Sequence, residues 1–186
     1  MRFNTHYALA DSHAFLAPSK PAWLKYDDAK LDRVFFASEA AKRGTALHDL
    51  AERLISLGQT LTKNTKTLNM YVNDAIGFHM TPEQTLVYSP NCFGKADAIG
   101  FRSEKLRIHD LKTGVTQTSF MQLMVYAALF CLEYHIRPFE IETELRIYQN
   151  DEMKSLIPDP IDISSVMEII KYQDKRVELL KEEVSS

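Results

Sequence analysis

Two alternating segments separated by a tight turn constrain this chain more than any other part of its sequence. Residues 93–101 (FGKADAIGF) and 105–112 (KLRIHDLK) both alternate with the two-residue period of a β-strand. If Ser103-Glu104 form the loop of a hairpin, counting back along both strands places Asp97 directly opposite Asp110. Opposed residues hold their β-carbons about 4.5–5.5 Å apart, so two carboxylates would repel each other there. Because hard cations bind clustered carboxylate oxygens, the hairpin predicts a divalent metal site.

The flanking sequence supplies helices and further strands. A helical spacing of leucines follows Ser38, a typical N-cap residue, and stops at Gly58. Ser165, with Glu168 three residues later, is a capping-box signal for a C-terminal helix. The expected helices cover residues 38–58, 68–78 and 118–136, the last apolar almost all round, and the expected strands cover 84–89, 93–101, 105–112 and 139–149, with a turn at Asn150-Asp151 and a short run at 153–158.

This order of elements predicts an α/β fold with a mixed central sheet of about four to five strands flanked by helices. A length of 186 residues fits one domain, 1–186. We expect an irregular N-terminal segment at 1–36, with a turn and a short helix in APSKPAW, then a core at 37–160 and a C-terminal helix at 161–186.

Composition excludes several classes of protein. A net charge of -3 argues against a protein that holds nucleic acid by bulk positive charge, although a local basic groove stays open. Two cysteines are too few for a Cys₄ zinc site or an iron–sulfur cluster. The longest apolar stretch is shorter than the roughly 20 residues of a membrane span. The N-terminus lacks the features of a signal peptide, so we expect a cytoplasmic protein without a membrane partner.

Further polar residues accompany the predicted aspartate pair. Lys112 shares a strand face with Asp110, His48 lies on the first long helix, and Gln122 and Tyr126 share one face of the apolar helix. Each has an ordinary structural reading, as a surface or turn carboxylate, a strand-end lysine, a helix-surface histidine or a satisfied core pair. Their occurrence together, in compatible positions, favours a functional site.

Four motifs follow one another along the chain: GTALHDLAE (44–52), GKADAIG (94–100), HDLKTG (109–114) and QLMVYAALF (122–130). In this order they resemble the motifs of RecB-type nucleases of the PD-(D/E)XK superfamily. The resemblance spans 38–148, and SKPAWLKYDD is similar to the start of phage- and prophage-encoded relatives. The resemblance implies a restriction-endonuclease-like core.

The resemblance also implies roles for individual residues. His48, Asp97 and Asp110 would bind Mg²⁺ or Mn²⁺. The Leu111 carbonyl would assist, and Lys112 would be the catalytic lysine alongside the two aspartates.

Other positions would support this site or the substrate. The resemblance implies that Gln122 and Tyr126 steady the site and contact DNA, with Lys95 and Thr113 beside them. Many relatives, including the CRISPR-adaptation exonucleases, carry four cysteines for an iron–sulfur cluster. This chain lacks the early cysteine, so we expect no cluster.

We expect a metal-dependent deoxyribonuclease, an exonuclease acting at DNA ends in phage-type recombination or repair, in the host cytoplasm if phage-encoded. An endonuclease or flap nuclease, a non-catalytic DNA-binding protein and a small-molecule enzyme are the alternatives. DNA is the expected partner, and a single-strand annealing or recombination protein is a candidate protein partner. Homo-oligomerisation is an open alternative.

Because the DNA backbone must meet positive charge, we expect a rim of basic residues around the site. Its candidates are Lys42, Arg43, Lys63 and Lys66.

Overall fold

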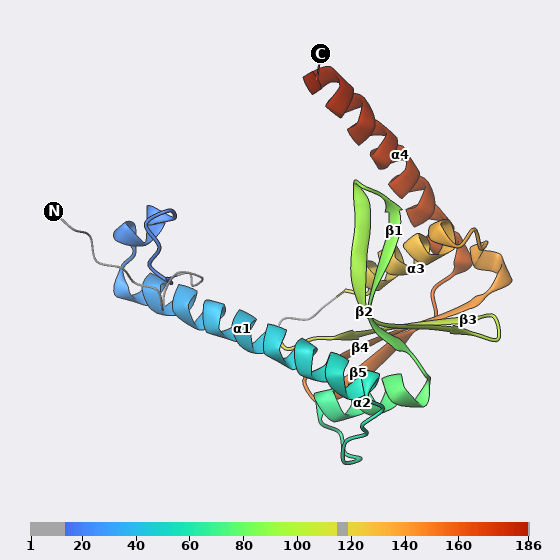
Figure 1. Cartoon of the computed structure of the whole chain (residues 1–186), viewed down its shortest axis with the longest axis horizontal. Coiled ribbons are helices and arrows are strands. Elements are labelled where there is room, and N and C mark those ends of the chain that lie inside the picture. The colour runs from blue at the N-terminus through green and yellow to red at the C-terminus, as the bar shows by residue number, and fades with distance from the viewer. Residues whose placement is uncertain (1–13, 115–118, 186) are drawn as a thin grey trace, which may run out of the picture. The chain divides into compact units, whose positions relative to one another are not determined.

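The structure is a computed structural model that describes residues 14–114 and 119–185. The chain divides into two compact units, Met1–Arg43 and Gly44–Ser186. Helix α1 (Asp28–Ser56) begins in the first unit and ends in the second (Figure 1).

The first unit holds the short 3₁₀ helix η2 (Pro21–Lys25) and the beginning of α1. Proline at the start of η2 has the backbone angle that a helix needs. The Trp23 ring Nε1 donates a hydrogen bond to the Ala17 carbonyl at 3.1 Å. The turn and short helix expected in APSKPAW are therefore confirmed.

Helix α1 begins well before Ser38, so the expected start at Ser38 and the irregular assignment of residues 28–36 are wrong. Asp27 gives the physical reason. Its Oδ1 accepts a hydrogen bond from the Lys30 backbone N–H at 2.8 Å, which satisfies a donor that would be free at the helix start. Ser38 consequently lies inside the helix.

The second unit contains a five-stranded mixed sheet in the order β1-β2-β3-β4-β5, which confirms the expected α/β class. All neighbouring strands are antiparallel except β3 and β4, which run parallel. The expected short run after residue 152 is a strand, and it forms one edge of the sheet. The strands are β1 (Thr81–Ser89), β2 (Cys92–Arg102), β3 (Lys105–Leu111), β4 (Glu142–Gln149) and β5 (Glu152–Leu156).

The β2–β3 hairpin has the register that the sequence predicts. Arg102 pairs with Lys105, and the ladder continues to Ala98 opposite His109. Ser103 and Glu104 both have positive φ, at 50° and 58°, as a two-residue loop of type I′ requires. The next position along this register holds Asp97 and Asp110.

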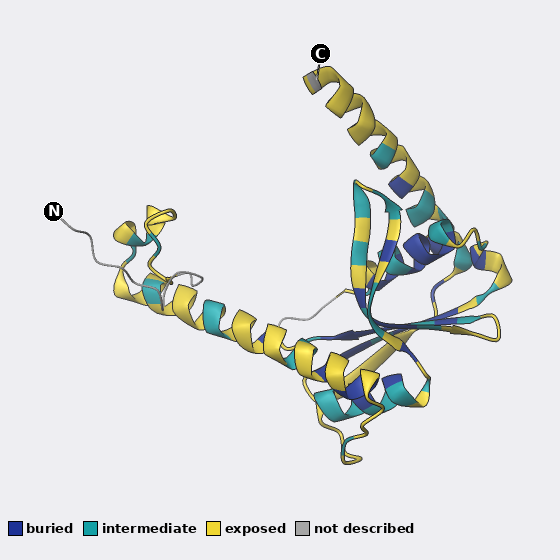
Figure 2. Ribbon diagram, in the orientation of Figure 1, coloured by how far each residue is buried: buried dark blue, intermediate teal, exposed yellow. Residues whose placement is uncertain are grey.

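Helices cover both faces of the sheet and bury two apolar clusters (Figure 2). Adjacent residues of β4 point to opposite faces, and they belong to different clusters. Ile147 packs in the cluster with α3 (Met121–Glu133) and α4 (Pro160–Ser185). Tyr148 packs in the cluster with α2 (Thr67–Gly77) and the end of α1. Helices α2 and α3 confirm two expected helices, although residue 118, the expected start of the second, lies outside the described residues.

Helix α4 also begins earlier than its predicted capping box. Asp159 Oδ1 accepts a hydrogen bond from the Ile161 backbone N–H at 2.8 Å, and Pro160 starts the helix. The Ser165 hydroxyl instead donates to the Ile161 carbonyl at 2.8 Å within the helix. The capping box at Ser165 is therefore wrong. Among the described residues, no helix is both long and apolar enough to cross a membrane.

Candidate metal centre

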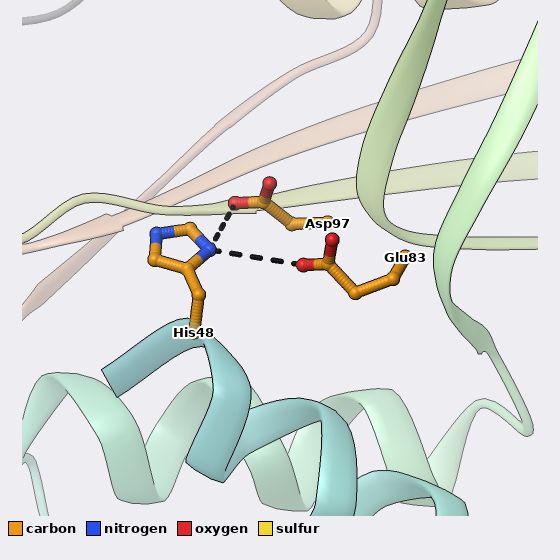
Figure 3. A group of neighbouring side chains, drawn as sticks. All are labelled: His48, Glu83 and Asp97. Carbon is orange, nitrogen blue, oxygen red and sulfur yellow. Dashed lines mark ion pairs between the residues drawn. The ribbon is translucent and has the colours of Figure 1, made fainter. Parts of the chain in front are cut away.

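Three potential metal ligands converge from three separate elements of the second unit (Figure 3). His48 comes from α1, Glu83 from β1 and Asp97 from β2. The His48 Nδ1 atom lies 3.6 Å from Asp97 Oδ2 and 3.9 Å from Glu83 Oε1. One ligand atom of each residue falls within 4.8 Å of the others, a spacing that one divalent cation could bridge.

The β1–β2 ladder brings the two carboxylates of this group together. Pro82 pairs with Ala98, so the next position places Glu83 across from Asp97. Glu83 has a φ of 50°, in the left-handed region that non-glycine residues seldom adopt. Ala96 packs in the cluster under α3, whereas Ala98 packs in the cluster under α2, so the regular alternation of β2 is broken between them. Backbone strain of this kind gathers at functional sites.

Asp110 lies beside this group and is only 2% exposed. Its Oδ1 forms an ion pair with Lys112 Nζ at 2.9 Å. Its Oδ2 is buried and has no hydrogen-bond partner among the described residues. A buried carboxylate oxygen without a partner is costly, and a cation would satisfy it.

Electrostatics agree with this interpretation. Burial, and after it the neighbouring charge of Asp110, raise the pKa of Asp97 from 3.8 to about 6, against the Leu111 backbone N–H that donates to Asp97 Oδ2 at 2.8 Å. Burial also raises the pKa of Asp110, although Lys112 opposes the shift. Ionising both buried carboxyl groups is therefore costly, and a divalent cation bound between them would lower that cost.

The expected supporting residues form a chain of polar contacts. Lys112 Nζ donates to Gln122 Oε1 at 3.0 Å, and Gln122 Nε2 donates to the Tyr126 hydroxyl at 3.3 Å. The Tyr126 hydroxyl in turn donates to the Lys95 carbonyl at 2.7 Å. The expected shared face of Asp110 and Lys112, and that of Gln122 and Tyr126, are both confirmed.

Steric crowding explains why glycine occupies two of the motif positions. A β-carbon at Gly44 would lie 2.9 Å from Thr113 Oγ1, and one at Gly94 would lie 3.0 Å from Tyr126 Cε1. A larger residue at either position would force the contacted side chain, Thr113 or Tyr126, to shift. Glycine therefore lets these two side chains lie directly against the backbone of α1 and of β2.

The group of residues that could hold a metal differs in part from the predicted ligands. His48 and Asp97 meet as predicted, but their third companion is Glu83, which the sequence reasoning missed. Asp110 is outside this group of three, but its charge acts on Asp97, and its side chain binds Lys112. The contact that Leu111 makes at the site is through its backbone N–H, and the role of its carbonyl stays a prediction. The position of Glu83 in the strand that pairs with the Asp97 strand could have indicated its place in the group. Because proline is rare inside strands, the expected strand began after Pro82 and left Glu83 out.

The predicted DNA-backbone residues are dispersed. Lys42 forms an ion pair with Glu39 at 2.8 Å in the first unit, where Arg43 is also exposed. In the second unit Lys63 is exposed, and Lys66 binds the Asp151 carboxylate at 2.6 Å, which occupies its ammonium. The basic rim stays a prediction.

Comparison of the chain with protein-family models, with curated proteins and with solved structures gave no significant match.

Proposed function

We propose that this protein is a metal-dependent deoxyribonuclease of the PD-(D/E)XK type, which hydrolyses phosphodiester bonds of DNA. The observation that carries the proposal is the group of His48, Glu83 and Asp97 beside a buried Asp110 that has a bare carboxylate oxygen. Lys112 binds that same Asp110 side chain. Ligands for a hard cation and a lysine thus adjoin one another, an arrangement that suits metal-dependent hydrolysis of a phosphodiester.

Three carboxylates and one imidazole would hold Mg²⁺ or Mn²⁺, namely Glu83, Asp97, Asp110 and His48. When bound, the metal would supply an activated water and stabilise charge on the scissile phosphate. Lys112 would hold a proton donor toward that water or toward a phosphate oxygen. Asp110 and Gln122 fix the lysine ammonium from two sides, at 2.9 and 3.0 Å, so that it does not need to reorient during the reaction.

The motif resemblance favours an exonuclease that acts at DNA ends. Two substrates separate this activity from its alternatives. End-labelled linear duplex and closed circular DNA are incubated with the protein in Mg²⁺, in Mn²⁺ and in excess chelator. Degradation of the linear DNA alone supports the exonuclease, and nicking of the circle would replace it with an endonuclease. Binding of either DNA without metal-dependent cleavage would reject the nuclease.

A further inference from the structure

The two oxygens of the Glu83 carboxylate have different partners. Oε1 faces His48 Nδ1 at 3.9 Å, within the candidate metal group. Oε2 forms an ion pair with Lys95 Nζ at 2.5 Å. A lysine ammonium therefore holds a carboxylate that the metal would also bind.

The backbone of Lys95 is fixed in the sheet, whereas its ammonium is held by the ion pair with Glu83. It pairs with Thr85 in the β1–β2 ladder, and its carbonyl accepts the hydrogen bond from Tyr126. The side chain is 57% exposed, and a lysine stem has four rotatable bonds. The ammonium can thus leave Glu83 while the backbone of β2 stays in place.

Two positive charges can offset most of the negative charge at the site in either of two ways. Glu83, Asp97 and Asp110 carry three negative charges, and in the metal-free protein Lys95 and Lys112 each neutralise one of them. A divalent cation carries the same two positive charges. When it is bound at Glu83, that carboxylate no longer needs Lys95, and the Lys95 ammonium released beside the metal would face the polyanionic substrate. Lys112 keeps its bond to Gln122.

We propose that Lys95 is a substrate-positioning residue which stands in for the metal at Glu83 and is released by the divalent cation to bind a DNA phosphate. Release of the Lys95 ammonium requires only that a divalent cation binds to the group of His48, Glu83 and Asp97. The contact of Lys95 with a DNA phosphate rests in addition on the proposed nuclease function. Metal binding would then prepare the site for DNA in two ways, through its own charge and through the freed lysine.

The test measures how fast each lysine is acetylated by acetic anhydride, read by mass spectrometry of peptides. A lysine held in an ion pair reacts slowly, because the carboxylate keeps its proton in place. We expect Mg²⁺ alone to raise the acetylation rate of Lys95 several-fold. Lys66, held by Asp151 at 2.6 Å outside the site, is the matched control and should keep its rate. An unchanged Lys95 rate in Mg²⁺ would overturn the proposal.

A variant and a second ligand complete the test. In Glu83→Gln the ion pair is absent, so Lys95 should react fast with or without Mg²⁺; slow reaction in that variant would contradict the proposal. Adding duplex DNA in Ca²⁺ should protect the released Lys95 again, and lack of protection would remove the phosphate contact. DNA cleavage is followed in parallel. Release of Lys95 without cleavage rejects the nuclease alone, and cleavage without release rejects the role of Lys95 alone.

Discussion

Two clusters of charged residues lie on the same sheet, and they are built on opposite plans. In the metal centre, three carboxylates face two lysines and one histidine. In a second cluster, which we call the arginine cluster, Asp74 and Glu144 are matched by Arg107, Arg146 and Lys105. Arg146 Nη1 contacts Asp74 at 2.9 Å, Lys105 Nζ contacts Glu144 at 3.1 Å, and the Tyr148 hydroxyl donates to Asp74 at 2.6 Å.

The pKa values of the carboxyl groups reflect this difference. Burial tends to raise the pKa of Glu144, but hydrogen bonds from Arg146 and Lys105 outweigh it and hold the pKa below its usual range. Burial raises the pKa of Asp97 and of Asp110, and their lysine and backbone partners do not compensate. The cations of the arginine cluster thus hold the pKa of Glu144 down, whereas the carboxyl groups of the candidate metal centre keep raised pKa values, as we expect of a site proposed to bind a divalent cation.

The largest expected effect separates the clusters by activity. Asp110→Asn removes a carboxylate charge next to Lys112, and we expect it to lower the DNA cleavage rate at least about a thousandfold. Lys112→Ala should act similarly. Glu144→Gln, a matched neutralisation in the arginine cluster, should keep its rate under conditions where it is folded. Near-normal cleavage by Asp110→Asn would sink the assignment of the active site.

Stability should separate the clusters in the other direction. Glu144→Gln leaves Arg146, Arg107 and Lys105 without their shared carboxylate, and breaking such a half-buried network costs about 3 kcal/mol of unfolding free energy. Urea unfolding, followed by circular dichroism, measures it. A loss as large for Asp110→Asn in metal-free buffer would show that the two clusters do not differ.

Neutralising Asp97 should stabilise the metal-free protein. The folded Asp97 keeps a proton up to about pH 6, whereas an unfolded aspartate loses it near 3.8. Between these values the folded form binds more protons, so its stability falls as pH rises. Asp97→Asn should flatten this slope and add on the order of 1–3 kcal/mol at pH 7. Thermal melts of the wild type and of Asp97→Asn in chelator, across pH 4–7, measure the effect. The prediction would be contradicted if the stability of the wild type rose with pH in this window and that of Asp97→Asn did not.

A smaller effect concerns metal preference. Imidazole is a softer ligand than carboxylate and suits Mn²⁺ better than Mg²⁺. Mn²⁺ should therefore support cleavage at least as well as Mg²⁺, and His48→Ala should weaken Mn²⁺ binding about tenfold and Mg²⁺ binding less. Calorimetric titration of both ions into the wild type and the variant gives the affinities. Equal affinities with and without His48 would remove it from the ligands.

The sequence predicts the part of the site that depends on local pattern. The Ser103-Glu104 loop sets the hairpin register, and strand alternation then places Lys112 beside Asp110. Helical spacing places Gln122 and Tyr126 on one face. These relations are fixed by the geometry of one hairpin or one helix, so they need no knowledge of the remaining chain.

The parts that were missed depend on contacts distant in sequence or on single capping atoms. Glu83 joins the site only through the β1–β2 register and a left-handed backbone, and Pro82 concealed its strand. A proline is tolerated there because β1 is an edge strand. The early start of α1 depends on Asp27, whose carboxylate caps the helix through the Lys30 backbone N–H. Asp27 and Ser38 are both typical cap residues, so the sequence does not show which of them begins the helix.

The two-residue loop between β2 and β3 has a consequence for the order of folding. Hairpins with short loops close in about 1–10 μs, whereas the parallel pairing of β3 with β4 must await the long crossover through α3. We therefore expect the hairpin to bring Asp97 and Asp110 together before Gln122 reaches Lys112. If this happens before the rate-limiting step, the repulsion between the two carboxylates slows folding, and a divalent cation that binds them would speed it. Stopped-flow refolding should accordingly be faster with Mg²⁺ present from the start than with Mg²⁺ withheld, and equal rates would place the assembly of the carboxylates after the barrier.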